Sequence, residues 1–262
     1  MRTALVVTLS SCLFACSGSA ETNSTEGIAA TRQAVQVSPL AVGFAGCTEI
    51  ASLAPAPVAN VRPLVPARFT LTSGGPGLAI LVVRIANCAS VTVDGKSVGG
   101  GTVAQIGANL VSPDGTGDID NYTLYYSTTS GLLANRLRSF GVPAQHVQNI
   151  DYVTALANGS GSIAIGVPRP MDAPYTVSGF IVAPAPQLVP FTANWWADDN
   201  GKSTRMQTPI AQIAFGAGNL TLTTSAQGNL GTIFGTGTVT FPYFDSYNTF
   251  GAATMTTAYV SF

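Results

Sequence analysis

Leu78-Ala79-Ile80-Leu81-Val82-Val83-Arg84-Ile85-Ala86 is a nearly continuous apolar run in which Arg84 is the single charged residue. Residues of this kind favour an extended backbone, and a strand that is apolar on both faces must be covered on both. The run therefore predicts a central strand of a sheet. Ser90–Val93 prolongs the strand signal, and the pair Asp94-Gly95, typical of a tight turn, ends it.

Similar segments rich in Thr, Val, Tyr and Phe recur along the chain and suit a pleated, half-buried surface. They predict strands at Arg68–Leu71, Thr102–Val111, Tyr122–Ser127, Ser162–Val167, Tyr175–Ala183, Asn219–Thr224, Thr232–Phe241 and Ala252–Phe262. The glycine-rich stretches Gly99–Gly101 and Gly228–Gly237 predict bulges or corners where a sheet bends. No internal linker or repeat interrupts residues 41–262, so we expect them to form a single β-rich domain.

One helix is expected near residues 131–140. Ser130 is a suitable N-cap, and Gly141 followed by Pro143 ends the helix. Between these signals the apolar residues follow the spacing of one helical face, at Leu133, Leu137 and Phe140. The sequence thus predicts a mostly antiparallel β-barrel or sandwich with one helix packed against it.

The composition excludes two classes of protein. Only 9% of the 262 residues are Asp, Glu, Lys or Arg, against about 25% in a typical soluble domain. Eleven basic residues face 12 acidic ones, which leaves a net charge of −1 and no basic surface for a nucleic-acid partner. With 46% hydrophobic residues the chain also cannot be a disordered acidic tail.

The N-terminus predicts export. An apolar run from Ala4 to Ala15 follows a basic start and fits a signal-peptide core, because it is too short to span a bilayer. Cleavage is possible before Cys16, as in a bacterial lipoprotein, before Cys12, or after Ala20. We assign residues 1–15 to a signal peptide, lipidation to Cys16, and the small polar residues 16–40 to a flexible tether. The expected location is the bacterial cell envelope, with membrane contact only through the lipid; free secretion is the alternative.

Counting cysteines predicts one disulfide bond. The chain contains Cys12, Cys16, Cys47 and Cys88. Cleavage before Cys16 or after Ala20 leaves Cys47 and Cys88 as the thiols free to pair, and an exported protein occupies a compartment where disulfides persist. We therefore expect a Cys47–Cys88 bond, and two buried free cysteines are the alternative.

Three pieces of the chain, in order, resemble the acetoacetate decarboxylase superfamily. Val61-Arg62-Pro63-Leu64-Val65-Pro66 is similar to that family's early leucine–proline segment, and Tyr122-Thr123-Leu124-Tyr125 to its Tyr-x-Glu strand. Leu137-Arg138-Ser139-Phe140-Gly141-Val142-Pro143-Ala144 is similar to its helix end, which runs into Gly-Tyr-Pro-Lys. The resemblance covers about residues 61–183. It implies a cone-like β-barrel with a buried, largely apolar pocket and makes Tyr122 and Tyr125 ligand-binding candidates.

The chain departs from that family at the two positions that carry its chemistry. The family's lysine, which forms a Schiff base with a ketoacid, matches Ala144, and its strand glutamate matches Leu124. Alanine cannot form an imine and leucine cannot move a proton. The two lysines in the chain, Lys96 and Lys202, each follow a turn signal and are expected in solvent. The resemblance therefore implies the pocket without amine-based decarboxylation, and no cofactor is expected.

Other side chains are candidates for the site. Arg84 interrupts a central strand, and a buried arginine needs a partner, either a ligand carboxylate or an Asp in a salt bridge. Trp195 and Trp196 are adjacent, so strand alternation sends one inward and one outward; both are ligand-binding candidates.

Titratable groups supply weaker candidates. His146, the single histidine, is a candidate general base, with Asp151 or Asp118 as its partner. Asp114, Asp118 and Asp120 lie on a glycine-rich stretch and are weak candidates for Ca²⁺, although Asp, Gly and Asn are also ordinary turn residues. We assign no metal site.

Three functions remain compatible with these residues. The first is an exported, lipid-anchored barrel that holds a small organic ligand, a carboxylate or an apolar molecule, without imine chemistry. The second is an enzyme of another mechanism that uses His146 and an Asp. The third is a structural surface lipoprotein. A hollow interior favours the first two, and a carboxylate within hydrogen-bond reach of His146 inside it favours catalysis.

Overall fold

The computed structural model describes residues 38–168 and 174–262. The predicted signal peptide, the lipidation site Cys16 and nearly all of the predicted tether lie outside the described residues. Where the structure describes the chain, none of its helices has the length and apolar character needed to cross a membrane.

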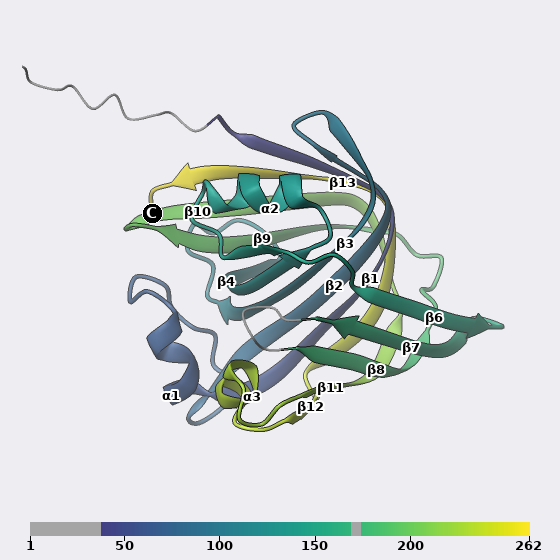
Figure 1. The fold of residues 1–262 in the computed structure, drawn as a ribbon. Helices are drawn as coiled ribbons and strands as arrows, with labels where there is room; N and C mark the ends of the chain where they lie inside the picture. The colour runs from purple at the N-terminus through teal and green to yellow at the C-terminus, as the bar shows by residue number, and fades with distance from the viewer. Residues whose placement is uncertain (1–37, 169–173) are drawn as a thin grey trace, which may run out of the picture. The chain divides into compact units, whose positions relative to one another are not determined.

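The described chain is built mainly of strands (Figure 1). The strands are β1 (Leu40–Pro57), β2 (Leu78–Val93), β3 (Lys96–Leu110), β4 (Ile119–Thr128), β5 (Ala144–His146), β6 (Asp151–Ala157), β7 (Ser160–Val167), β8 (Tyr175–Val182), β9 (Val189–Asp199), β10 (Lys202–Phe215), β11 (Ala217–Thr224), β12 (Thr238–Thr240) and β13 (Phe244–Val260). The helices are α1 (Val58–Val61), the 3-10 helix η1 (Arg62–Leu64), α2 (Gly131–Arg138) and α3 (Asn229–Phe234).

The larger sheet closes into a barrel. Its strand order is β3-β2-β1-β13-β10-β9-β4, and β4 pairs back onto β3, with β5 added to the edge of β4. Neighbours in the barrel are antiparallel except β4 and β9, and β5 also lies parallel to β4. The predicted, mostly antiparallel β-barrel is confirmed.

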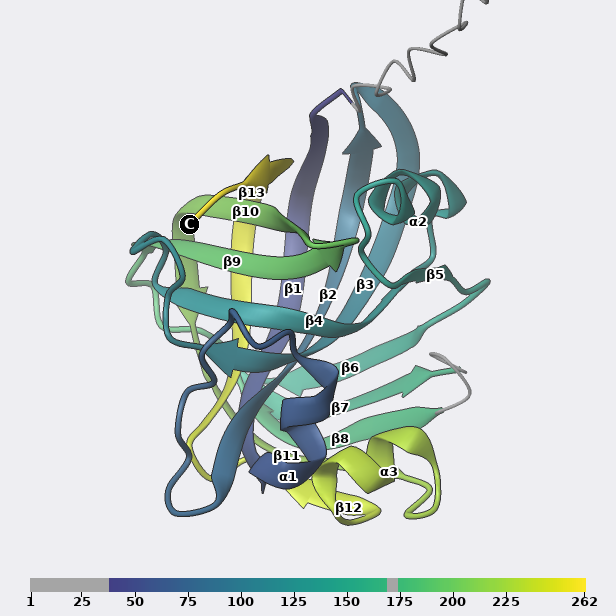
Figure 2. The same ribbon diagram turned by 90° about the vertical axis from the view of Figure 1, so that its left-hand side faces the viewer.

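A second, antiparallel sheet covers one outer side of the barrel. Its order is β12-β11-β8-β7-β6, and Figure 2 shows it beside the lower parts of β1, β2 and β3. Apolar side chains of this sheet and of α3 form one core with the outward-facing residues of β1–β3, among them Ile50, Val83 and Ile106. A second core fills part of the barrel interior.

The two cores explain the apolar run of β2. Leu81, Val83 and Ile85 point outward into the core shared with the second sheet, whereas Val82 points into the barrel. Because β2 lies between β1 and β3 and is covered on both faces, its sequence does not alternate with polar residues. The predicted central strand is confirmed. The Asp94-Gly95 turn is also present, with positive φ at both residues as a tight hairpin turn requires.

Helix α2 plugs one end of the barrel. Its buried residues Leu133 and Leu137 pack with Leu40 and Val42 of β1 in the interior core. The predicted caps are present: the Ser130 hydroxyl accepts a hydrogen bond from the Leu133 amide, 3.2 Å away, and Gly141 has a φ of +76°. The interior is therefore closed and packed at the α2 end.

Replacing Ser130 with alanine is expected to destabilise the protein by about 1 kcal/mol, because the substitution removes the acceptor for an otherwise unpaired amide at the helix start. Urea unfolding at equilibrium measures the loss. Ser130→Asp restores an acceptor and is expected to keep nearly all of the stability. Equal losses in the two variants would show that the cap contributes nothing.

One strand prediction was wrong, and a second was right only for its last part. Arg68–Leu71 forms turns that end in one isolated bridge, between Leu71 and Leu110. Within Thr232–Phe241 the chain completes helix α3, which ends at Gly235 with a φ of +76°, and β12 occupies Thr238–Thr240. The β-branched residues of this segment are helical because Leu230, Ile233 and Phe234 are buried against the barrel. The expected corner at Gly228–Gly237 is accordingly a helix.

Strands β1, β5, β6, β9 and β10 were not predicted. Gly and Pro in β1 and Pro209 in β10 read as loop signals. Ladders on both sides hold β1 extended, since it pairs with β2 and β13 along most of its length. Pro209 lies where the β10–β13 ladder lapses, between Gln207 and Ile213, so its missing N–H breaks no hydrogen bond there.

Candidate functional site

The barrel encloses a cavity of about 460 Å³ at the end opposite α2. Most of its wall is apolar side chain, and a few polar groups interrupt it. The lining residues are Glu49, Ala51, Ser52, Leu53, Val82, Arg84, Asp118, Ile119, Asn121, Pro190, Phe191, Ala193, Trp195, Thr208, Ile210, Phe215, Phe244 and Asn248. The barrel interior is therefore hollow at one end and packed at the other.

The exposed members of this lining mark the mouth of the cavity. Asp118, Pro190 and Phe244 are exposed, whereas Glu49, Asn121 and Asn248 are buried. The Asp118 carboxylate accepts a hydrogen bond from the Thr192 amide at 2.7 Å. A molecule entering the cavity thus passes an acidic group and aromatic carbon before it reaches the buried polar groups.

A buried ion pair lies at the inner part of the cavity. The Arg84 Nε donates to Glu49 Oε2 at 2.8 Å, and a second guanidinium nitrogen lies 2.8 Å from the same oxygen. The third guanidinium nitrogen donates to the Gln105 side-chain oxygen at 2.7 Å. The Glu49 and Arg84 side chains are 5% and 14% exposed. The partner of Arg84 is therefore a glutamate on the neighbouring strand β1, two residues from the position that pairs with Arg84.

Asn248 completes this polar cluster. Its side-chain nitrogen donates to Glu49 Oε1 at 3.3 Å, which gives each Glu49 oxygen a donor. The side-chain oxygen of Asn248 is buried and has no hydrogen-bond partner. Strand register explains how these residues meet, because Arg84 pairs with Gln105 of β3 and Glu49 with Asn248 of β13.

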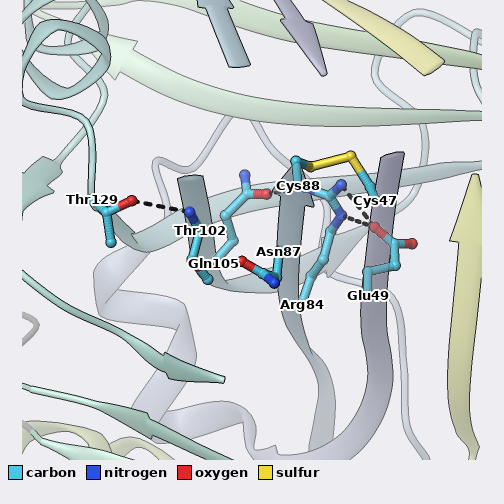
Figure 3. The surroundings of a disulfide bond; sticks show 8 residues. All are labelled: Cys47, Glu49, Arg84, Asn87, Cys88, Thr102, Gln105 and Thr129. Carbon is cyan, nitrogen blue, oxygen red and sulfur yellow. Dashed lines mark hydrogen bonds and ion pairs between the residues drawn. A yellow bond between two sulfur atoms is a disulfide. The ribbon is translucent and has the colours of Figure 1, made fainter. Parts of the chain in front are cut away.

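The predicted Cys47–Cys88 disulfide is present and adjoins the cluster (Figure 3). It joins directly paired positions of β1 and β2, and in the barrel interior it packs with Val103 and Phe250. Glu49 and Arg84 lie on the same two strands. The bond therefore ties together the two strands that supply the ion pair.

Neither lysine reaches the cavity. Lys96 and Lys202 are exposed, Lys96 directly after the Asp94-Gly95 turn and Lys202 at the start of β10. The Lys202 ammonium lies 5.5 Å from the centre of the Tyr259 ring. Within the described chain the cavity lining contains one cationic side chain, Arg84, and no primary amine.

Trp195 and Trp196 point in opposite directions from β9, as strand alternation predicts. Trp195 lines the cavity and packs closely against Gly107, where an added Cβ would lie 2.7 Å from its ring. Trp196 is fully buried on the outer side of the barrel, where its Nε1 donates to Asp120 at 2.7 Å and its ring meets Phe69. Only Trp195 is placed to contact a ligand in the cavity.

Tyr122 and Tyr125 lie at a second, more open hollow of about 530 Å³ outside the barrel. Leu124 and Pro143 also line it, with residues of α1 and α3. Burial raises the pKa of both tyrosines, so they remain neutral hydrogen-bonding groups at physiological pH. The structure does not bring these tyrosines together with Arg84 and Trp195.

The two positions that match the superfamily's lysine and glutamate are apart from the ion pair. Leu124 lines the outer hollow, and Ala144 is buried in the core beneath α2. Neither side chain carries a titratable group, so neither position supplies a nucleophile or a proton donor.

His146 and Asp151 lie outside both hollows. His146 is exposed on β5, with its ring against Gly131 at the start of α2. Asp151 is exposed and forms a hydrogen bond with Asn149. The arrangement does not place these two side chains, or His146 and Asp118, in one cavity.

The three aspartates between residues 114 and 120 each have a different hydrogen-bond or ion-pair partner. Asp114 pairs with Arg205, and although partial burial raises its pKa, hydrogen bonds from Thr116 and the nearby Arg205 bring the pKa below its ordinary value. Asp118 lies at the cavity mouth and Asp120 accepts from Trp196. Across residues 38–168 and 174–262, no group of three or more His, Cys, Asp or Glu side chains is arranged to hold a metal ion.

Sequence reasoning missed Glu49, Gln105, Asn248 and the aromatic wall of Phe191, Phe215 and Phe244. Arg84 was the one local signal, because a charge inside an apolar run demands a buried partner. Its partners are 35 and 21 residues away in sequence. Strand register alone identifies them, and β1, which carries Glu49, was not predicted.

Comparison with solved structures finds the same architecture in three enzymes. An acetoacetate decarboxylase-like enzyme from Sphingomonas wittichii RW1 aligns with 87% of this chain and 94% of its own, at 11% identity and a TM-score of 0.55. Acetoacetate decarboxylase from Legionella pneumophila aligns with 84% of this chain and 87% of its own, at 9% identity and a TM-score of 0.54. An enduracididine biosynthesis enzyme, complexed with the condensation product of pyruvate and imidazole 4-carboxaldehyde, aligns with 85% of this chain and 89% of its own. The identity is 13% and the TM-score is 0.51.

No protein-family model matches the sequence, and no curated protein matches it either. The structural likeness spans most of each chain at low sequence identity, so it establishes the fold. The chain has the acetoacetate-decarboxylase-like fold that its sequence resemblance implied.

Proposed function

We propose that this protein binds a small organic molecule inside its barrel and does not act as an amine-based decarboxylase. The observation that carries the proposal is a cavity of about 460 Å³ whose wall is mainly apolar and contains Trp195 and one buried ion pair. Concave apolar cavities with a few converging polar groups are the usual form of small-molecule sites. A barrel with a purely structural role has no need to keep this space open.

The absence of imine chemistry rests on the residues themselves. A Schiff base requires a primary amine with access to the substrate carbonyl. Both lysines of the chain are exposed and remote from the cavity lining. The matching position, Ala144, has no nucleophile. Borohydride treatment in the presence of acetoacetate is therefore expected to leave the protein mass unchanged, and a trapped adduct would refute this part of the proposal.

We further propose that the protein works outside the cytoplasm, attached to a membrane through a lipid on Cys16. Two features support this. The first 15 residues have the composition of a signal peptide that ends before a lipidated cysteine. The disulfide bond between Cys47 and Cys88 is typical of oxidising compartments. Mass spectrometry of the protein purified from membranes tests this, since the expected N-terminus is a lipidated Cys16.

Filling the cavity is expected to abolish binding. Ala193 lines the cavity and is 7% exposed, so Ala193→Leu places added carbon atoms in the ligand's space. We expect uptake of the neutral fluorescent probe N-phenyl-1-naphthylamine to weaken at least about tenfold, because the occupied volume excludes the probe. Fluorescence titration measures the affinity.

The matched control is Ala258→Leu, on the exposed face of β13, which is expected to bind the probe like the wild type. Native mass spectrometry of the exported protein searches for a co-purifying ligand. A wild-type protein that takes up no probe and carries no bound molecule would refute the proposal.

A further inference from the structure

We infer that the cavity selects neutral organic molecules that carry a hydrogen-bond acceptor, such as ketones, aldehydes or esters, and rejects carboxylates of the same size. This inference rests on the proposed binding function and names its ligand class. It follows from the charges of the lining and from how they are already paired.

The lining has no positive charge to spare for a carboxylate. Its charged side chains are Arg84, Glu49 and Asp118, so the formal sum is one positive and two negative charges. Two guanidinium nitrogens of Arg84 each lie 2.8 Å from the same carboxylate oxygen of Glu49. The buried pair is therefore neutral, and Asp118 leaves the mouth of the cavity acidic.

A carboxylate that entered would have to compete with Glu49 for Arg84. Glu49 is held on both oxygens, by Arg84 and by Asn248, and it lies in a strand fixed on both sides by ladders. Displacing it would leave one of two carboxylates unpaired in a mainly apolar interior, which is strongly unfavourable. Like charges near one another in a poorly hydrated space add a further penalty.

A neutral acceptor meets no such penalty. A guanidinium has five N–H donors, and the contacts to Glu49 and Gln105 use three of them. Arg84 lines the cavity, so a ligand carbonyl can accept one of the remaining N–H groups without breaking the ion pair. The aromatic and aliphatic wall, including Phe191, Phe215 and Trp195, then covers the rest of the ligand.

The unpaired oxygen of Asn248 adds to the selection against carboxylates. It is an acceptor in a fully buried side chain of the lining, and it would repel a ligand carboxylate while tolerating a hydroxyl or a bridging water. This oxygen therefore disfavours a carboxylate, and with a ketone or ester in the cavity a bridging water can satisfy it.

The test compares two probes with the same number of non-hydrogen atoms, 2-nonanone and octanoate, by isothermal titration calorimetry of the wild-type protein at pH 7.5. We expect 2-nonanone to bind and octanoate to bind about 100-fold more weakly or not at all. Octanoate binding as tightly as 2-nonanone would overturn the inference and leave the proposed function standing. Binding of neither probe would overturn both.

A variant tests whether Glu49 is the cause. Glu49→Gln keeps the shape of the side chain and one acceptor oxygen but removes the negative charge that pairs with Arg84. We expect the affinity for octanoate to gain at least about tenfold relative to the affinity for 2-nonanone. Asp94→Asn, in the exposed pair with Arg136, is the matched control and is expected to change neither affinity. An unchanged octanoate affinity in a folded Glu49→Gln variant would overturn the inference; if the variant does not fold, the wild-type comparison decides.

Discussion

Arg84→Met is expected to destabilise the protein by about 3–5 kcal/mol, because it leaves the Glu49 carboxylate buried without its cationic partner. The Glu49 side chain is 5% exposed, so the little water that reaches it compensates only in part for the lost guanidinium. Methionine fills a similar volume and adds no polar group, which confines the effect to the missing charge and hydrogen bonds. Equilibrium urea unfolding, followed by far-ultraviolet circular dichroism, measures the loss.

Two further variants isolate the charge effect. Arg136→Met breaks the exposed pair with Asp94, whose side chains are 26% and 35% exposed, and is expected to cost no more than about 1 kcal/mol. Arg84→Met combined with Glu49→Met removes both buried charges and is expected to recover most of the stability lost in Arg84→Met. A double variant no more stable than Arg84→Met would contradict the assignment of that cost to an unpaired carboxylate.

Removal of the disulfide by Cys47→Ala and Cys88→Ala is expected to lower the free energy of unfolding by about 2–4 kcal/mol. The cysteines are 41 residues apart in sequence, so the bond removes a long loop from the unfolded ensemble. It joins directly paired residues of β1 and β2, which the ladder already holds together in the folded state. The loss should therefore appear chiefly as a change in the unfolded state.

The measurement is equilibrium unfolding of the double variant beside wild-type protein with its disulfide intact and wild-type protein that has been reduced. Reduced wild type is expected to match the variant. Because Cys47 and Cys88 do not line the cavity, the affinity for 2-nonanone is expected to stay within about threefold of the wild type. A double variant as stable as oxidised wild type would refute the prediction.

The features predicted correctly from sequence depend on neighbouring residues or on simple counting. The helix was identifiable because Ser130, the apolar stripe and Gly141 all act within a few residues of one another. The turn at Asp94-Gly95 and the central position of β2 are equally local. The disulfide was predicted by counting cysteines, since the proposed cleavage and lipidation at Cys16 would leave Cys47 and Cys88 to pair.

The errors arose where tertiary contacts override local preference. Thr232–Phe241 contains β-branched residues, yet α3 forms there because it buries Leu230, Ile233 and Phe234 on the barrel. Strand β1 contains glycines and prolines that read as loop signals, yet two ladders hold it extended. Local propensities amount to about 1 kcal/mol or less per residue, so burial of a few large side chains outweighs them.

The amino-acid sequence was sufficient to predict a mostly antiparallel β-barrel or sandwich, the capped helix α2, the Cys47–Cys88 disulfide and the exposure of Lys96 and Lys202, because each of these depends on short-range pattern or composition. It also indicated that Arg84 needs a buried partner. Only the closed barrel identifies that partner as Glu49, places Gln105 and Asn248 beside it, and separates Trp195 in the cavity from Trp196 outside. These contacts join residues up to 199 positions apart, and their geometry is set by strand register around the barrel, which no local stretch of sequence encodes.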